Sequence, residues 1–212
     1  MIGSIGRRLA WIAMLAAAHC VRHPPIVGEQ PPVLKNSSAE SAYQDALARY
    51  SDRSEIYDRL DTRLFAAATY QSWPFRQARV QRMALFQVQP PPVVLKKLDL
   101  EKAEFDAFHD FFLGVHVNAR RFDDFDRPNS IWRVSLVTAA AEASPASIER
   151  VGRADLNMRA IYPYMDEFWE GYRVRFPRKL PDGTTLVLPE TAKFTLRVAS
   201  TLGKAEMVFP VE

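Results

Sequence analysis

Stretches in which apolar and polar side chains alternate with a period of two constrain the fold of this 212-residue chain more than any other feature. The clearest one spans residues 171–177, where Tyr172, Val174 and Phe176 are separated by arginines. Alternation of this kind places successive side chains on opposite faces of a β-strand. We therefore expect a strand here, and further strands at residues 57–70, 109–117, 131–137, 194–198 and 205–209.

Other segments carry apolar side chains at helical spacing. These are residues 39–50, 75–88, 93–108 and 155–162, while residues 139–145 have the character of a turn or loose connection. Three consecutive prolines separate the second and third segments, which would form a helical hairpin inserted at about 74–108. We predict a mainly β chain with a helical insertion (α+β), an immunoglobulin-like or related antiparallel β-sandwich with an inserted helical hairpin.

The first helix of this hairpin has a recognisable start. Pro74 suits the first turn of a helix, and Ser72 is placed to cap it. Arg76, Arg79 and Arg82 would lie along one side of the helix. Such a row could meet anionic lipid headgroups, but we favour a solvated helix face.

The beginning of the chain has the layout of a bacterial export signal. Arg7 and Arg8 precede an apolar run at residues 9–18, followed by small residues where a peptidase would cut. This run of ten residues is too short for a membrane-spanning helix, which needs about 20. The sequence therefore predicts a signal peptide at residues 1–19.

Cys20 is the only cysteine, so no disulfide can form within the chain. The four residues 17–20, Ala-Ala-His-Cys, resemble a bacterial lipoprotein signal, although His19 stands where a small residue is usual. That resemblance implies cleavage before Cys20 and acylation of its thiol. The alternative is cleavage after Ala18, which would leave a secreted protein with a free thiol. We favour acylation, because a lone cysteine in an exported chain needs an explanation.

The segment after the cysteine, residues 20–38, is rich in proline and has the composition of an extended tether. Residues 39–212 would then form a single domain. Loss of Arg7 and Arg8 with the signal leaves 26 basic residues of 28 against 25 acidic ones, a net charge of +1. This balance gives no indication of a nucleic-acid partner, for which a clustered basic face is expected.

An aromatic stretch offers a possible ligand-binding surface. Tyr162, Tyr164 and Trp169, with Arg173 nearby, could dock a sugar or a peptide. The interpretation that we favour is that these rings pack in the core, because large aromatic side chains dominate core energetics.

The remaining polar cluster consists of His109, His116 and three aspartates at 123–126. On a strand, the two histidines would face opposite sides, because their positions differ by an odd number. We therefore predict no metal site, no other cofactor and no catalytic residue here. No serine lies in a Gly-x-Ser-x-Gly motif.

The segments Ser-Ile-Trp-Arg at residues 130–133 and Gly-Tyr-Arg-Val-Arg-Phe-Pro at residues 171–177 resemble a group of uncharacterised bacterial lipoproteins. The resemblance spans about residues 39–209. It implies an export signal, a proline-rich tether and one mixed domain, and it implies no activity.

These features together predict an envelope-anchored lipoprotein held by a lipid on the periplasmic side of a membrane, with the outer membrane favoured. Its domain would be a non-enzymatic binding or assembly module. Its partners would be the membrane, reached through the N-terminal lipid, and an envelope protein or glycan. The alternative is a soluble secreted or periplasmic hydrolase with an unrecognised site.

Overall fold

The computed structural model describes residues 33–35, 37–139, 141–188 and 190–211 of the chain. The predicted signal peptide at 1–19 and Cys20 lie outside these residues, as does most of the tether. The described residues form an α+β fold with two antiparallel sheets. Its helices are α1 (Ser38–Tyr50), α2 (Trp73–Phe86), α3 (Pro91–Ala107) and α4 (Leu156–Ile161), with one 3₁₀ turn at Arg120–Phe122. No helix in the described ranges is both long and apolar enough to cross a membrane.

The larger sheet has five strands in the order β1-β2-β3-β7-β6, and the smaller has four in the order β5-β4-β8-β9. The strands of the larger sheet are β1 (Ser51–Asp58), β2 (Asp61–Tyr70), β3 (Phe108–Val117), β6 (Ser147–Arg153) and β7 (Glu170–Pro177). Those of the smaller sheet are β4 (Arg133–Val137), β5 (Glu142–Ala143), β8 (Lys193–Ser200) and β9 (Gly203–Pro210). The helices α2 and α3 come between β2 and β3, where the sequence predicts a helical hairpin.

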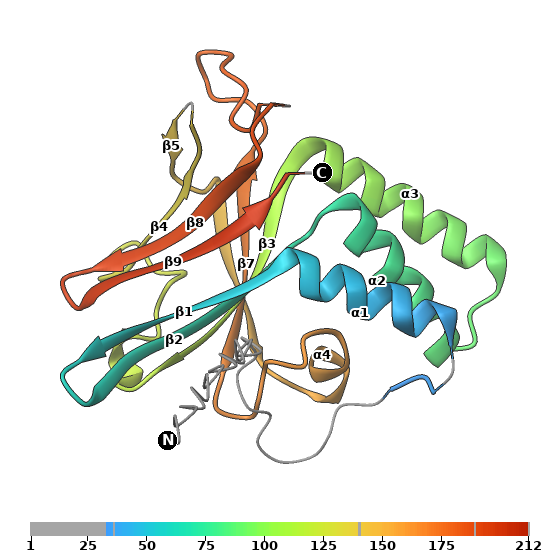
Figure 1. The fold of residues 1–212 in the computed structure, drawn as a ribbon, viewed down its shortest axis with the longest axis horizontal. Coiled ribbons are helices and arrows are strands. Elements are labelled where there is room, and N and C mark those ends of the chain that lie inside the picture. Colours follow the sequence, from blue (N-terminus) through green and yellow to red (C-terminus); the bar gives the residue numbers. More distant parts are fainter. Residues whose placement is uncertain (1–32, 36, 140, 189, 212) are drawn as a thin grey trace, which may run out of the picture.

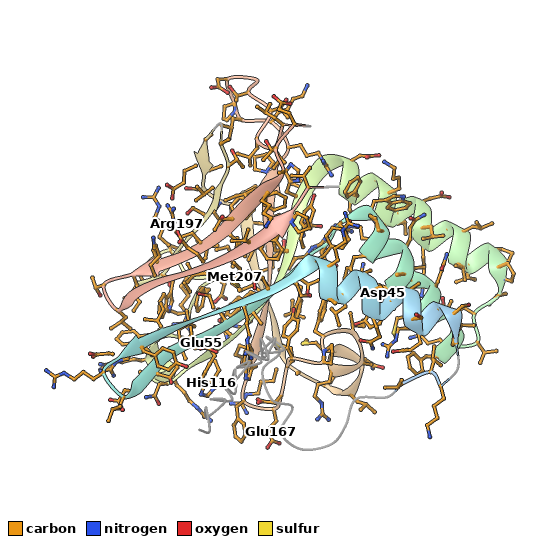
Figure 2. All side chains as sticks on the ribbon, viewed as in Figure 1. Asp45, Glu55, His116, Glu167, Arg197 and Met207 are labelled. Atoms are coloured by element: carbon orange, nitrogen blue, oxygen red, sulfur yellow. The ribbon has the colours of Figure 1, made fainter. Side chains whose placement is uncertain are left out.

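The two sheets pack against one another through an aromatic core. The ring of Phe111 on β3 lies 5.3 Å from that of Phe209 and 6.0 Å from that of Phe194, both on the smaller sheet. Tyr70 on β2 meets Phe194 edge to face at 5.0 Å. These contacts follow from the alternation in the sequence, because every second residue of each strand points to the core. One of the residues that point to the core is the buried Met207 on β9, which is labelled in Figure 2.

Side chains of β1 join the two sheets at one edge. The backbone amide of Val208 donates to Oδ2 of Asp52 at 2.8 Å, and that of Glu206 donates to Oγ of Ser54 at 3.1 Å. Side chains of β1 thus supply acceptors to β9. Figure 1 shows these two strands as neighbours. Amides at the edge of a sheet are otherwise open to pairing with another chain.

The opposite face of the larger sheet is covered by helices and by the segment after α4. Figure 1 shows α1, α2 and α3 grouped together at one end of the molecule. At Gly114 on β3 the covering segment comes very close, because a Cβ atom there would lie 2.3 Å from Sδ of Met165. The Tyr164 hydroxyl is 2.8 Å from the Thr69 hydroxyl beside it. A glycine on β3 therefore permits this layer to lie on the sheet.

A buried arginine ties three helices together. Arg82 on α2 is 2% exposed, and its Nε and Nη2 donate to the Glu40 carboxylate of α1 at 2.6 and 3.1 Å. It also donates to the carbonyl of Ala160 on α4 and lies 4.2 Å from the centre of the Tyr43 ring. Burial raises the pKa of Glu40, but the bonds from Arg82 and Gln44 outweigh it, so the net pKa is lowered.

The structure corrects three predictions. Residues 57–70 are not one strand, because Arg59 has a left-handed φ of 58° and begins a turn between β1 and β2. Strand β5 lies within residues 139–145, for which the sequence predicts a turn or loose connection, and β6 follows where no element is predicted. Arg76 and Arg82 are buried and do not form a solvated helix face, because carboxylates from other elements surround them.

Candidate functional site

A pocket of about 420 Å³ lies between the helices α2 and α3 and the outer face of the larger sheet. Helix α4 and strand β6 contribute further walls. Most of its polar lining is charged, and the charged side chains come from α2, α3, β3 and β7. These side chains are Arg76, Arg79, Glu101, Glu104, Asp110 and Arg173.

Arg76 is the centre of the charged lining. The sequence places it in the first turns of α2, where the Ser72 hydroxyl caps the helix by accepting from the Phe75 amide. Its guanidinium is 1% exposed and donates to Asp110 on β3 and to Glu101 on α3, each at 2.5 Å. A buried charge is tolerated only with such partners. Arg76 therefore fixes the two helices to the sheet.

Arg173 brings a second cation to the same carboxylate. It lies on β7, the neighbour of β3, and its Nη2 donates to Asp110 at 2.7 Å and to Glu104 at 2.5 Å. Burial lowers the pKa of Arg173, but these two carboxylates outweigh burial and raise it. The pKa of Glu104 is raised by burial and lowered more strongly by Arg173 and Arg76, so the net shift is downward. Arg173 and Glu104 are therefore charged at neutral pH.

The apolar walls of the pocket come from aromatic and aliphatic side chains. The Tyr162 ring stacks on the Phe112 ring with 3.7 Å between their centres. Ile161 and Met158 of the α4 region complete this side. The Tyr162 hydroxyl donates to Oε1 of Gln71 at 3.3 Å, and burial raises its pKa. Tyr162 is thus a neutral wall of the pocket.

The positive and negative charges of the pocket are equal in number, but one carboxylate oxygen has no hydrogen-bond donor. Three guanidinium groups face three carboxylates, and Arg79 pairs with Glu101 at 2.5 Å. Within the described residues, however, Oδ1 of Asp110 is buried and accepts no hydrogen bond. Arg175 Nε forms an ion pair with it at 3.9 Å, too far for a hydrogen bond, and is itself buried without a hydrogen-bond partner. A buried carboxylate oxygen without a donor is costly, so this atom favours a ligand or water that donates to it.

The structure brings together two of the four predicted ligand-binding residues. Tyr162 and Arg173 line the pocket, one as an aromatic wall and one as a charged group. Tyr164 and Trp169 are buried further along the sheet, where both pack near Gly114. Sequence reasoning missed most of the charged lining. One signal could have found it: Glu101 and Glu104 stand three apart on a helix that follows a row of arginines.

The predicted separation of the two histidines is confirmed. Nδ1 of His109 lies 3.1 Å from the Tyr70 hydroxyl in the core between the sheets. His116 lies on the other face, where its Nδ1 is 3.2 Å from the Phe168 carbonyl oxygen. No group of three His, Cys, Asp or Glu side chains in the described ranges could hold a metal ion.

A scan of protein-family models, a search of curated proteins and a search of solved structures each find no match to this chain.

Proposed function

We propose that this chain is an envelope-anchored lipoprotein whose folded part is a non-enzymatic binding or assembly domain. The observation that carries the binding role is the Oδ1 atom of Asp110, which accepts no hydrogen bond although Asp110 lines a pocket whose charged side chains are paired. A pocket of this volume falls within the range that holds small ligands. Its rigid, ion-paired walls would present the same surface to each ligand.

The pocket chemistry favours a neutral ligand that carries hydroxyl or amide donors, such as a glycan unit. Equal numbers of cations and anions give no net field that would select an ion. A hydroxyl group could donate to Asp110, while the face of the sugar could pack against the apolar side formed by Ile161 and Met158. A glycan of the cell envelope is therefore the partner that we favour over an envelope protein.

Titration of the full chain with N-acetylglucosamine and with glucose, followed by calorimetry, tests the binding role. We expect saturable binding that Asp110→Asn weakens and that Met158→Trp, which narrows the pocket, also weakens. Arg133→Gln, an exposed change on the smaller sheet, serves as the control and should bind as the unaltered chain does. Met158→Trp leaves the ion pairs of Asp110 in place, so it tests the pocket even if Asp110→Asn does not fold properly. If neither sugar binds saturably, the glycan proposal is wrong.

The anchoring role rests on Cys20 and on the resemblance to bacterial lipoproteins. Cys20 lies outside the residues that the structure describes, so the structure does not test this role. Metabolic labelling with palmitate should mark the chain in a Gram-negative host and should fail to mark Cys20→Ala. The labelled form should stay with the membrane, on the periplasmic side. Equal recovery of both forms in a detergent-free supernatant would contradict anchoring without affecting the binding role.

The alternative, a secreted or periplasmic hydrolase, has less support. A general base must lie within hydrogen-bond reach of its partner. Among the residues that the structure describes, the contacts of His109 and His116 are to Tyr70 and to a backbone carbonyl. The hydroxyl groups of Ser130 and Ser135 donate to carboxylates instead. These pairings favour the non-enzymatic proposal.

The finer description of the fold, an immunoglobulin-like or related sandwich, belongs to the same proposal. The facing of two antiparallel sheets across an aromatic core supports it. An experimental structure in which the two antiparallel sheets do not face each other across this core would contradict it.

A further inference from the structure

A second pocket, of about 310 Å³, lies at the other end of the larger sheet from the first, where β3 ends and β7 begins. The end of β3, the start of β7, the end of β6 and the connection at 118–127 form its walls. His116, which is labelled in Figure 2, lies at its β3 wall, and the exposed ring of Phe168 lies at its rim. None of the residues in the first pocket takes part in this one.

Cations outnumber anions in this second pocket. Four arginines line it against two carboxylates, so its lining has an excess of two positive charges at neutral pH even with His116 neutral. This differs from the first pocket, where the charges are equal. The charged groups are Arg120, Arg127, Arg150 and Arg153, with Asp123 and Glu170.

Two of the four arginines, Arg150 and Arg153, form ion pairs, and Arg153 lies 3.5 Å from Glu170. Arg150 lies 3.2 Å from both Asp126 and Glu170, and its guanidinium is 4.9 Å from the centre of the Tyr172 ring. The Tyr172 hydroxyl in turn donates to Asp123 at 2.8 Å. Both carboxylates of the pocket, Asp123 and Glu170, are thus already bonded to other side chains. These contacts give the pocket a rigid floor. A rigid floor reduces the entropy lost when a ligand binds.

The other two arginines are not used in this way. Within the described ranges, Arg120 and Arg127 are exposed and form no ion pair. The short 3₁₀ turn begins at Arg120, with two residues between it and the end of β3, and the Arg127 amide closes a turn by donating to the Asp124 carbonyl. The chain thus brings both side chains to the pocket while leaving their guanidinium groups available. Guanidinium groups bind phosphate oxygens through two parallel hydrogen bonds.

We propose that this second pocket binds a phosphate-bearing ligand, with Arg120 and Arg127 as the groups that contact the phosphate. Arg150 and Arg153 contribute positive charge from the floor and the β6 side. The phosphate belongs either to a soluble phosphomonoester or to the headgroup of an anionic phospholipid. The two sources share the chemistry that this pocket recognises.

Calorimetry of the full chain with inorganic phosphate and with glycerol 3-phosphate tests the soluble source. Flotation of the Cys20→Ala chain with vesicles tests the headgroup, because this variant cannot be carried by an acyl chain. The vesicles contain phosphatidylcholine alone or mixed with phosphatidylglycerol. We expect binding in at least one arm, and weaker binding at higher salt, because screening reduces the attraction between exposed charges.

The decisive variant is the double change Arg120→Gln with Arg127→Gln. We expect it to weaken binding about tenfold or more, since each lost bond joins two charged groups. Arg133→Gln with Lys193→Gln removes the same charge from the exposed surface of the smaller sheet and should leave binding within about twofold of the unaltered chain. Binding lost equally in both double variants, or absent in both arms, would overturn the proposal. Neither outcome bears on the glycan site, which shares no residue with this pocket.

Discussion

Lowering the pH from 7 to 5 should destabilise the folded protein by about 2 kcal/mol through one side chain, His109. This imidazole is 3% exposed in the core between the sheets. Burial, reinforced by the positive charge of Arg178, lowers its pKa from 6.5 to about 3. The unfolded chain therefore takes up a proton near pH 6.5 that the folded chain refuses until about pH 3.

The sign and size follow from this difference in proton uptake. The free energy of unfolding falls as the pH drops below 6.5, by about 1.4 kcal/mol per pH unit, and levels off near pH 3. Between pH 7 and pH 5 the fall from His109 amounts to about 2 kcal/mol. Its full contribution is present above pH 6.5.

Urea unfolding at a series of pH values measures this contribution. Carboxylates also titrate in acid, so the quantity of interest is the difference between the unaltered chain and His109→Gln. This difference in unfolding free energy should shift by about 2 kcal/mol between pH 7 and pH 5, in favour of the variant at the lower pH. Tyr70→Phe removes the neighbouring hydroxyl but leaves the imidazole buried, so it should keep the original pH dependence. Parallel pH profiles for the unaltered chain and His109→Gln would refute the reasoning.

Three other predictions concern the ion pairs, the packing and the sheet edge of the fold. Asp110→Asn should cost about 3–5 kcal/mol in urea unfolding, because it removes the buried negative charge that both Arg76 and Arg173 contact. The pair Arg76→Met with Asp110→Leu should cost less than the single change, and a larger cost would contradict the ion-pair account. Gly114→Val should cost about 1–3 kcal/mol, because its side chain collides with the layer above the sheet, and near-ultraviolet circular dichroism should register the displaced rings. In Asp52→Ala the Val208 amide should exchange its hydrogen severalfold faster, and an unchanged rate would show that the side-chain acceptor does not protect β9.

The elements with a strong periodic pattern could be predicted from the sequence. Helices α1, α2, α3 and α4 lie where helical spacing places them, and β3, β7, β8 and β9 follow the alternation of apolar residues. Ser72 caps α2 as expected. Except in α3, which has no buried residue, the buried side chains recur at the helix or strand period within one short segment, so the local sequence is enough to predict the element.

The edge strands could not be predicted in this way. Strand β1 begins with the polar run Ser-Asp-Arg-Ser-Glu at residues 51–55, and β6 exposes most of its side chains. Edge strands bury little, so pairing with a neighbour holds them in place and leaves no apolar pattern to read. The candidate site could not be predicted for a similar reason. Arg76 looks solvated within its own helix, and only the fold brings Asp110 to it from 34 residues away.

The buried arginines of α2 also bear on how the chain reaches its folded state. Arg76 needs carboxylates from α3 and β3, and Arg82 needs Glu40 from α1 and a carbonyl from the α4 region. An isolated helical layer would hold Arg76 without the Asp110 carboxylate that the sheet supplies. Helices and sheet are therefore obliged to form and to melt together, as one cooperative unit whose transition has a single midpoint.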